Sequence, residues 1–407
     1  MPKLSIIVPT RERSDTLVHT MRTLVSQDYP DCEILVSDNA SLDNTKEVVA
    51  SFTDARIRYI NTGKRVSMSE NWEFALQYAQ GEFITYIGDD DGFLPRAISK
   101  AMALLEDTGM SALAWDRVNY NWPSFTTEGA GNWIWVRVGK SHTYLAESRK
   151  RLAKLLQFRD GFAYSRLPGV YHGIVRKSLT DKVKESSSRK IFFDSISPDI
   201  FSALVIGMVL DRYLLSEYPF TIAGASRHST GLSTGKGELG DPNSSAGRFL
   251  SELSREFDSR VKIAPAIESL VMGEYLLAKQ ALPNFDFPEP SWNRYVRRLI
   301  RRAKNSDASD EILRSASHTV KLLGLKVKVP DQVVSNGLPL PTPGMQGDIL
   351  VFKAPESMVS NVFDACIVVA GMIPSPTAGN VTVSLRRFVR NMSGCFISEA
   401  KSLYRSV

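Results

Sequence analysis

The sequence contains little cysteine. Its 407 residues include three cysteines, Cys32, Cys366 and Cys395, which are odd in number and far apart. This spacing fits neither the disulfide framework of a small secreted protein nor the closely spaced ligands of a structural zinc site. We therefore expect the protein to work in a reducing compartment, the cytoplasm.

Long apolar stretches and targeting patterns are also missing. The longest apolar run in the C-terminal region, residues 365–373, is far shorter than the roughly 20 residues that a membrane-spanning helix needs. The N-terminus enters an apolar strand pattern almost at once, without the basic segment, apolar core and cleavage site of a signal peptide. The sequence thus predicts no transmembrane helix and no export.

The chain does contain enough apolar residues for two domains, or for one large domain with an appendage. Apolar residues make up 43% of the sequence, which supports a sizeable core. The formal net charge of +6 indicates a surface that tolerates anionic partners. Charge alone does not separate nucleotides, nucleic acids and lipid head groups.

Short apolar runs alternate with segments of helical periodicity in the N-terminal part of the chain. Ser69 resembles the N-terminal cap of the third such helix, and Pro95 the first residue of the fourth. Near-continuous apolar strands that alternate with helices favour an α/β fold with a mostly parallel central sheet and helices on both faces. The predicted strands are residues 4–8, 33–37, 57–60, 83–87 and 112–115.

Three of these strands end in polar residues: Pro9-Thr10-Arg11, Asp38-Asn39 and Asp89-Asp90-Asp91. The carboxyl ends of parallel strands meet at one edge of a sheet, which is where open α/β sheets bind ligands. Three adjacent carboxylates repel one another, and a bound cation would offset that cost. The plainer alternative is that Asp91-Gly92 only forms a turn into the next helix.

The convergence of the three strand ends favours a divalent-metal site that holds a phosphate-bearing substrate. Asp38 would accept hydrogen bonds from a base or ribose, and Arg11 would lie near phosphate. We therefore expect a nucleotide site at this edge of the sheet.

The alternation of strand-like and helix-like segments is weaker in the middle of the chain. Between residues 119 and 166 only a few leucines near residue 155 indicate a helix. Residues 169–175 predict a strand, and residues 196–201 open a helix with a carboxylate in its first turn. A further strand is expected at residues 218–223, followed by a Gly/Ser-rich loop to about Gly247.

The character changes to helices beyond Arg248. Residues 292–304 place apolar side chains on one helical stripe and Arg or Lys on the other face. Such a helix can lie on an anionic membrane surface, or it can pack its stripe on the protein and leave its arginines in water. The Pro/Gly-rich residues 329–347 predict a linker, and the rest of the tail predicts no particular structure.

Three motifs resemble the inverting nucleotide-sugar glycosyltransferases of family 2, which have the GT-A fold. They are residues 5–11, residues 35–45 with the pattern Asp-Asn-x-Ser-x-Asp-x-Thr, and the aspartate triplet followed by Pro95. The resemblance covers roughly residues 3 to 230. It implies a Rossmann-like catalytic domain, while the helical pattern beyond Arg248, which lies outside the resemblance, predicts a mainly helical C-terminal extension.

The resemblance also implies a division of the chain. The expected parts are a catalytic domain at 1–247, with a nucleotide-binding part at about 1–118 and an acceptor part at about 119–247, a helical extension at 248–328, and a linker and C-terminal segment at 329–407.

Roles for individual residues follow from the same resemblance. Gly88 stands where an acidic residue is more usual, which leaves the division of roles within the triplet open. The implied nucleotide contacts are Pro9, Thr10, Arg11, Asp38, Asn71, Asp89 and Arg227. The implied ligands of Mn²⁺ or Mg²⁺ are Asp90, Asp91 and His228.

The catalytic base in this family is a carboxylate at the start of a later helix. Asp199 matches that position, although Pro198 replaces the Glu that often precedes it, and Asp194 is close enough in sequence to compete. We favour Asp199 because the N-terminus of a helix keeps a carboxylate ionised.

The implied function is a metal-dependent, inverting transfer of sugar from a nucleoside diphosphate sugar to a hydroxyl of a glycan or glycolipid, in surface polysaccharide biosynthesis. We expect no nucleic-acid partner, and residues 292–304 leave contact with the inner face of a membrane open. Two alternatives remain: a non-catalytic nucleotide- or glycan-binding module of the same fold, and a nucleotidyltransferase. A dinucleotide oxidoreductase is disfavoured because no Gly-x-Gly-x-x-Gly follows the first strand.

Overall fold

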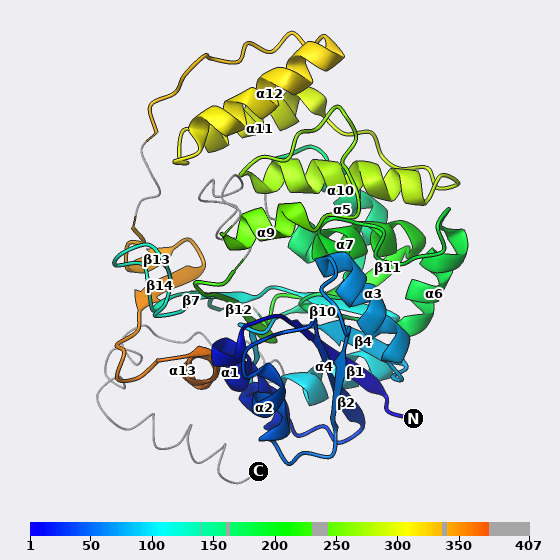
Figure 1. Ribbon diagram of the computed structural model, residues 1–407, viewed down its shortest axis with the longest axis vertical. Helices are drawn as coiled ribbons and strands as arrows, with labels where there is room; N and C mark the ends of the chain where they lie inside the picture. The colour runs from blue at the N-terminus through cyan, green and yellow to red at the C-terminus, as the bar shows by residue number, and fades with distance from the viewer. Residues whose placement is uncertain (140, 160–162, 230–242, 336–339, 374–407) are drawn as a thin grey trace.

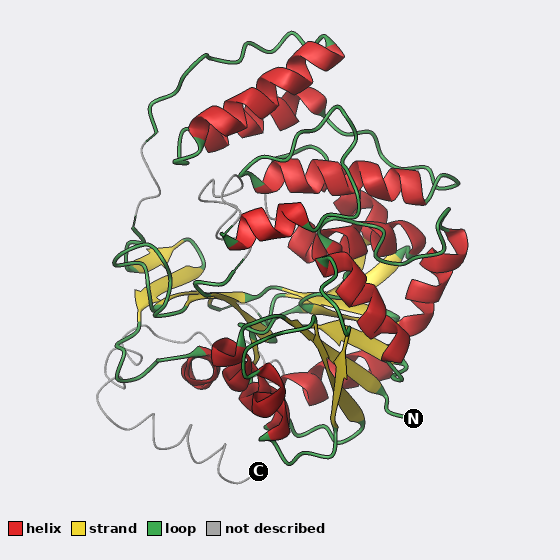
Figure 2. Ribbon diagram, in the orientation of Figure 1, coloured by secondary structure: helices red, strands yellow, loops and turns green. Residues whose placement is uncertain are grey.

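The computed structural model describes residues 1–139, 141–159, 163–229, 243–335 and 340–373 (Figure 1). Cys395 and most of the predicted Gly/Ser-rich loop, at residues 230–242, fall outside these ranges. The described chain forms two neighbouring sheets, with helices packed on both sides of the larger one and a further helical layer on one side (Figure 2).

The larger sheet contains the predicted N-terminal strands. Its strand order is β3-β2-β1-β4-β10-β6-β11-β9. Four of the seven pairings are parallel, while β10 runs antiparallel to both of its neighbours and β9 antiparallel to β11. The predicted α/β fold with a mostly parallel central sheet is therefore confirmed. The strands are β1 (Leu4–Thr10), β2 (Cys32–Asp38), β3 (Ile57–Asn61), β4 (Phe83–Tyr86), β6 (Ala112–Trp115), β9 (Thr143–Glu147), β10 (Gly173–Arg176) and β11 (Arg212–Ser216).

Side chains alternate between two apolar cores on the two faces of this sheet. On β1, Ile7 packs into one core, while Ile6 and Val8 pack into the other. The helices that flank the sheet or lie near its ends are α1 (Ser14–Val25), α2 (Thr45–Ala50), α3 (Met68–Tyr78), α4 (Ala97–Thr108), α5 (Ser148–Leu155), the 3₁₀ turn η1 (Ala163–Arg166), α6 (Lys177–Ser186) and α7 (Pro198–Val209).

Two predicted helix starts are wrong by two residues. Helix α3 is capped by Ser67 and not Ser69, because Ser67 exchanges the two hydrogen bonds of a capping box with Glu70. Helix α4 begins at Ala97, two residues after Pro95. In both cases the helix itself was predicted and only its first turn was misplaced.

The second sheet was largely missed by the sequence. Its order is β13-β14-β8-β7-β12-β5, and several of its strands pair with segments far away in the chain. The strand predicted at residues 218–223 is displaced: β11 ends at Ser216 and the next strand starts at Thr221. The strands are β5 (Gly92–Phe93), β7 (Val118–Asn121), β8 (Trp133–Arg137), β12 (Thr221–Ala225), β13 (Gly344–Gln346) and β14 (Ile349–Lys353).

The predicted helical extension forms a layer above the larger sheet (Figure 1). Helix α11 buries Tyr295, Val296, Leu299 and Ala303 in the same core as helices α7 and α10. Its apolar stripe therefore packs on the protein, which is the second of the two alternatives for the basic helix. The layer consists of α9 (Ser245–Ser251), α10 (Ile267–Ala281), α11 (Trp292–Ala303) and α12 (Ser309–Leu323).

The end of the described chain returns to the N-terminal half. Strand β14 extends the second sheet by pairing with β8, and helix α13 (Val362–Met372) packs against α1 and β5. At that contact the buried Cys366 fills the space beside Gly92. No helix in the described part of the chain is both long and apolar enough to cross a membrane.

The contact between α13 and β5 can be tested by a double-mutant cycle. A Cβ added at Gly92 would lie 2.7 Å from Cys366 Sγ, so Gly92→Ala should lower the free energy of unfolding by about 1–3 kcal/mol. Cys366→Ala removes the clashing sulfur, and the double variant should therefore lose less than the sum of the two single losses. Denaturant unfolding of the four proteins measures the coupling, and strict additivity would show that α13 does not dock there.

Candidate active site

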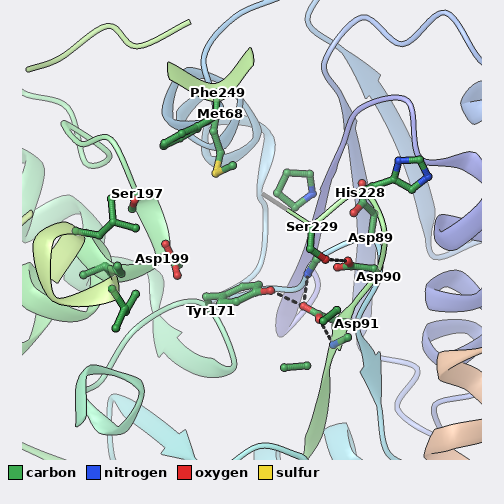
Figure 3. Close-up of a pocket in the computed structure, with 18 of the residues that line it drawn as sticks. Met68, Asp89, Asp90, Asp91, Tyr171, Ser197, Asp199, His228, Ser229 and Phe249 are labelled. Carbon is green, nitrogen blue, oxygen red and sulfur yellow. Dashed lines mark hydrogen bonds between the residues drawn. The ribbon is translucent and has the colours of Figure 1, made fainter. Parts of the chain in front are cut away.

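A cavity of about 830 Å³ lies between the ends of the sheet strands and the helical layer (Figure 3). Its walls include the ends of β1 and β4, residues from β7 and β12, the first turn of α7, and parts of α9 and α10. Strands that are distant in sequence thus deliver polar side chains to one place, as the sequence predicted for this edge of the sheet.

Asp89 is buried and paired. Its Oδ2 accepts a hydrogen bond of 2.7 Å from the Thr10 hydroxyl, and its Oδ1 lies 3.0 Å from the Arg13 guanidinium. Burial raises the pKa of Asp89, and the Arg13 charge opposes that rise. Arg13 also donates to the backbone carbonyl of His228, so it ties the end of β1 to the loop after β12.

Asp90 is held by hydroxyl groups. Ser226 and Ser229 donate to its Oδ2 at 2.8 and 2.6 Å, and Figure 3 shows the Ser229 bond at the cavity wall. The backbone carbonyl of Asp90 accepts a bond of 2.9 Å from the Trp122 indole. Within the described residues, every side-chain hydrogen bond to the Asp90 carboxylate goes to Oδ2.

Both carboxylate oxygens of Asp91 accept hydrogen bonds from the surrounding protein. Tyr171 and the backbone N–H of Gly88 donate to its Oδ2 at 2.5 and 2.9 Å, and the N–H of Gly224 donates to its Oδ1 at 2.8 Å. Burial, reinforced by the neighbouring Asp90 charge, raises the pKa of Asp91 to about 7. Both oxygens of Asp91 are therefore used to shape the strand end.

These hydrogen bonds and ion pairs determine which carboxylates of the triplet could bind a metal ion. Within the described residues no group of three or more His, Cys, Asp or Glu side chains could hold a metal, so Asp90, Asp91 and His228 are not brought together as a ligand set. Mg²⁺ in phosphate-binding sites is held by one or two carboxylates together with substrate phosphates and water. Asp90 at the cavity wall fits that pattern once a diphosphate is bound, and its role as the metal ligand stays a prediction.

The two residues predicted after β12 face away from Asp90. His228 Nε2 lies 3.2 Å from Asp15 Oδ2, and Arg227 lies 3.1 Å from the same oxygen. His228 lines the cavity, whereas Arg227 does not. The imidazole would have to leave Asp15 before it could complete a metal shell.

The predicted nucleotide contacts separate into two groups. Asp38 does not line the cavity; its carboxylate accepts hydrogen bonds from Tyr59, Asn61 and the backbone of Ser41. Arg11 lines the cavity and forms an ion pair with Glu252, just beyond helix α9. The other predicted contacts that line the cavity are Pro9, Thr10, Asn71 and Asp89.

Asp199 lies in the first turn of α7 and lines the cavity, on the opposite side of Tyr171 from the triplet in Figure 3. Burial raises the pKa of Asp199, whereas the Ile200 N–H and the Arg117 charge lower it. Desolvation therefore opposes the effect of the helix terminus on the pKa of Asp199, and it is the larger of the two.

Asp194, the alternative base, lies outside this cavity. It is buried between Arg189 and Arg255, whose guanidinium nitrogens lie 2.8 and 3.1 Å from its Oδ1. It lines a separate, smaller cavity. Because Asp199 shares the cavity with the aspartate triplet and Asp194 does not, the geometry favours Asp199 over Asp194.

Several residues of the site were not predicted. Arg117 bonds to Tyr164 and lies close enough to Asp91 and Asp199 to act on both electrostatically. The helical layer also contributes to the cavity wall, with apolar and cationic side chains. These are Arg248, Phe249, Ile267, Leu270 and Arg302.

The comparisons with known proteins agree with this class of site. Residues 5–178 match the family described as glycosyl transferase family 2. This part of the chain therefore resembles a family 2 glycosyltransferase, and it includes the strand that leads into the aspartate triplet.

Two curated relatives illustrate how far the similarity extends. GalNAc(5)-diNAcBac-PP-undecaprenol beta-1,3-glucosyltransferase of Campylobacter jejuni is 42% identical over 105 residues, 25% of this chain and 34% of the relative. UDP-Glc:alpha-D-GlcNAc-diphosphoundecaprenol beta-1,3-glucosyltransferase of Escherichia coli is 28% identical over 108 residues, 26% of this chain and 43% of the relative. The matches thus span less than half of these two relatives.

A solved structure of S. aureus TarS in complex with UDP resembles the chain more loosely. It is 14% identical, with a TM-score of 0.42, over 78% of this chain and 88% of that chain.

The raised pKa of Asp199 predicts a pH dependence. A base must be ionised to accept a proton, and a raised pKa means that the ionised form is lost at a higher pH as the solution is acidified. The acid limb of the kcat/KM profile for glycosyl transfer should therefore lie above the range of an ordinary aspartate. Arg117→Met should move this limb further upward, because the guanidinium lowers the pKa of Asp199.

The exposed Arg212 provides a control for that shift. Arg212→Met removes the same charge and should leave the acid limb in place. A limb that is identical in R117M and the unmodified protein would contradict the assignment of Asp199 as the titrating base.

Proposed function

We propose that the protein is a metal-dependent, inverting glycosyltransferase that moves a sugar from a nucleoside diphosphate sugar to a hydroxyl of a lipid-linked glycan. The observation that carries the proposal is the single cavity in which Asp90 and Asp199 line opposite walls. The family 2 match over residues 5–178 and the names of the curated relatives support the same reaction class.

The donor would occupy the half of the cavity formed by the strand ends. Thr10, Asn71 and Asp89 line this half and offer groups that hydrogen-bond ribose and base. Asp90 would hold Mn²⁺ or Mg²⁺ together with the diphosphate, and that ion would neutralise charge on the departing nucleoside diphosphate. Arg13 is already paired with Asp89, so we do not assign it to neutralising the diphosphate charge.

Asp199 would act as the general base. Its carboxylate would take the proton of the acceptor hydroxyl as that oxygen attacks the anomeric carbon from the face opposite the diphosphate. The raised pKa of Asp199 suits this task, since it brings the base closer to the operating pH. Arg117 would keep enough positive potential nearby for Asp199 to ionise before the acceptor binds.

The acceptor would bind against the helical layer. Phe249 and Leu270 of this layer, together with Met68 at the start of α3, give the wall an apolar surface, and Arg302 adds a cation. The buried Glu268 pairs with both Arg298 and Arg302, which leaves one positive charge in excess beside the cavity. An apolar wall with surplus positive charge suits a lipid joined to sugar through phosphate, which is the kind of acceptor named for the curated relatives.

This assignment makes residues 1–247 the catalytic domain and residues 248–328 an extension that completes the acceptor wall. We further propose a cytoplasmic protein that touches the inner face of a membrane through the outer side of α11. Arg297, Arg301 and Lys304 are exposed there, while Arg298 and Arg302 are used internally.

The two carboxylates predict two different losses. Asp90→Asn should weaken Mn²⁺-dependent binding of a nucleoside diphosphate by at least tenfold, because it removes the charged metal ligand. Asp199→Asn should leave that binding unchanged and lower kcat for transfer by roughly 10²–10⁴-fold, the usual contribution of a general base. Calorimetry with UDP and GDP in the presence of Mn²⁺ measures binding, and radiolabelled sugar transfer measures kcat.

Both variants keep a side chain of nearly the same shape, so thermal unfolding should confirm that they fold. Full transfer by D90N would overturn the metal assignment. Full donor binding by the unmodified protein without transfer to any lipid-linked acceptor would favour a non-catalytic binding module instead.

The acceptor wall gives a separate prediction. Leu270 is partly exposed in the cavity, so Leu270→Asn should raise KM for an acceptor with a long lipid by about tenfold. The KM for the donor should not change. Leu322→Asn alters an exposed leucine on α12 and serves as the control. An equal rise in KM for lipid-bearing and lipid-free acceptors would contradict a lipid contact at Leu270.

A further inference from the structure

Helix α10 carries a glutamate that reaches the turn before Asp199. Glu274 is fully buried, and its Oε1 accepts hydrogen bonds from the backbone N–H groups of Ile196, at 3.0 Å, and Ser197. These two amides immediately precede Pro198, the first residue of α7. Glu274 therefore holds the segment that leads into the catalytic helix.

The local sequence leaves this segment few other ways to be fixed. Ser197, the residue before α7, makes no side-chain capping bond, and Pro198 has no N–H to donate. Buried N–H groups require acceptors, and those of Ile196 and Ser197 use a carboxyl from another element. The position of Asp199 thus depends on a residue 75 positions further along the chain.

The surroundings of Glu274 favour the protonated, uncharged form of its carboxyl group. Burial raises the pKa of Glu274 well above its usual value, and the charges of Asp199 and Asp194 raise it further. Its Oε2 is buried and makes no hydrogen bond among the described residues. A neutral Glu274 can accept the two amide bonds without adding a second negative charge beside Asp199.

We propose that Glu274 is a positioning residue for the catalytic base, which makes α10 a required part of the catalytic unit. The proposal rests on the assignment of Asp199 as the base. It extends the working site from α7, which already lies beyond the family-matched residues 5–178, to α10, which spans Ile267–Ala281. Glu274 acts through the backbone of Ile196 and Ser197 and does not line the cavity itself.

Two substitutions separate the hydrogen-bond acceptor from the charge. Glu274→Gln keeps a carbonyl oxygen in place and should retain kcat to within about threefold. Glu274→Leu removes the acceptor, and we expect kcat to fall by about 10²-fold because small displacements of a catalytic group have large effects. Mn²⁺-dependent binding of UDP or GDP should stay within twofold of the unmodified protein in both variants, since the donor half is built by other elements.

Hydrogen exchange adds a readout of position. The amides of residues 196, 197 and 199–201 should exchange faster in E274L than in E274Q or the unmodified protein. Tyr275→Phe provides a matched control on the same helix, because it removes a buried hydrogen bond of 2.6 Å to Pro288 on another part of the structure. It should lower stability without changing kcat.

The outcomes distinguish this inference from the proposed function. Unchanged kcat in E274L, or an equal loss in E274Q, overturns the positioning role while leaving D199N inactive. Full transfer by D199N overturns the base assignment whatever Glu274 does. If E274L and a second apolar variant, E274M, both fail to fold while E274Q is native, the glutamate serves global stability and the positioning role is also overturned.

Discussion

The constraint on which this structure depends is the crowding of three carboxylates at one strand end. The negative charge of each carboxylate is offset in a different way. Asp89 pairs with the Arg13 guanidinium, and Asp90 accepts hydrogen bonds from serine hydroxyls. Asp91 accepts hydrogen bonds from backbone amides and the Tyr171 hydroxyl, and its pKa is raised to about 7. Because the partners come from β1, β12 and the loops beside them, the acidic turn can form only when both sheets are in place. Of the three, Asp90 is the one that we propose binds a cation from the cavity.

The helical layer has the complementary role. Through two buried glutamates, α10 organises both of its neighbours: Glu268 holds the arginines of α11 and Glu274 holds the turn before α7. The cavity therefore lies between a strand-end half, which combines the family-matched residues 5–178 with β12 and the loop after it, and a wall formed by α9–α11, which lies outside the match. Under the proposed function, such a division would let one donor-binding half serve with different acceptor walls, since function varies with the sites that a shared fold carries.

The sequence was sufficient where the pattern was local. Strands β1–β4 and helix α7 have periodicity that can be recognised within ten residues, and Asp199 was found because it follows directly from the start of α7. Strands β7 and β8 are short, and besides pairing with each other they depend on β12 and β14, which lie far later in the chain, so their local pattern carried no signal. Arg117 and Glu274 could not be found for the same reason, since nothing in their neighbours indicates which buried carboxylate or amide they meet.

The return of the chain to α1 has a consequence for its synthesis. Residues 349–353 complete one side of the sheet beside β8, and Cys366 fills the gap next to Gly92. The ribosome synthesises these segments after all the strands around the aspartate triplet, at roughly 5–20 residues per second. For that interval the nascent chain carries an open sheet edge and an uncovered apolar face on α1, both of which are targets for aggregation or chaperone binding. The open edge at β8 and the apolar face of α1 are therefore covered only after β14 and α13 have been synthesised.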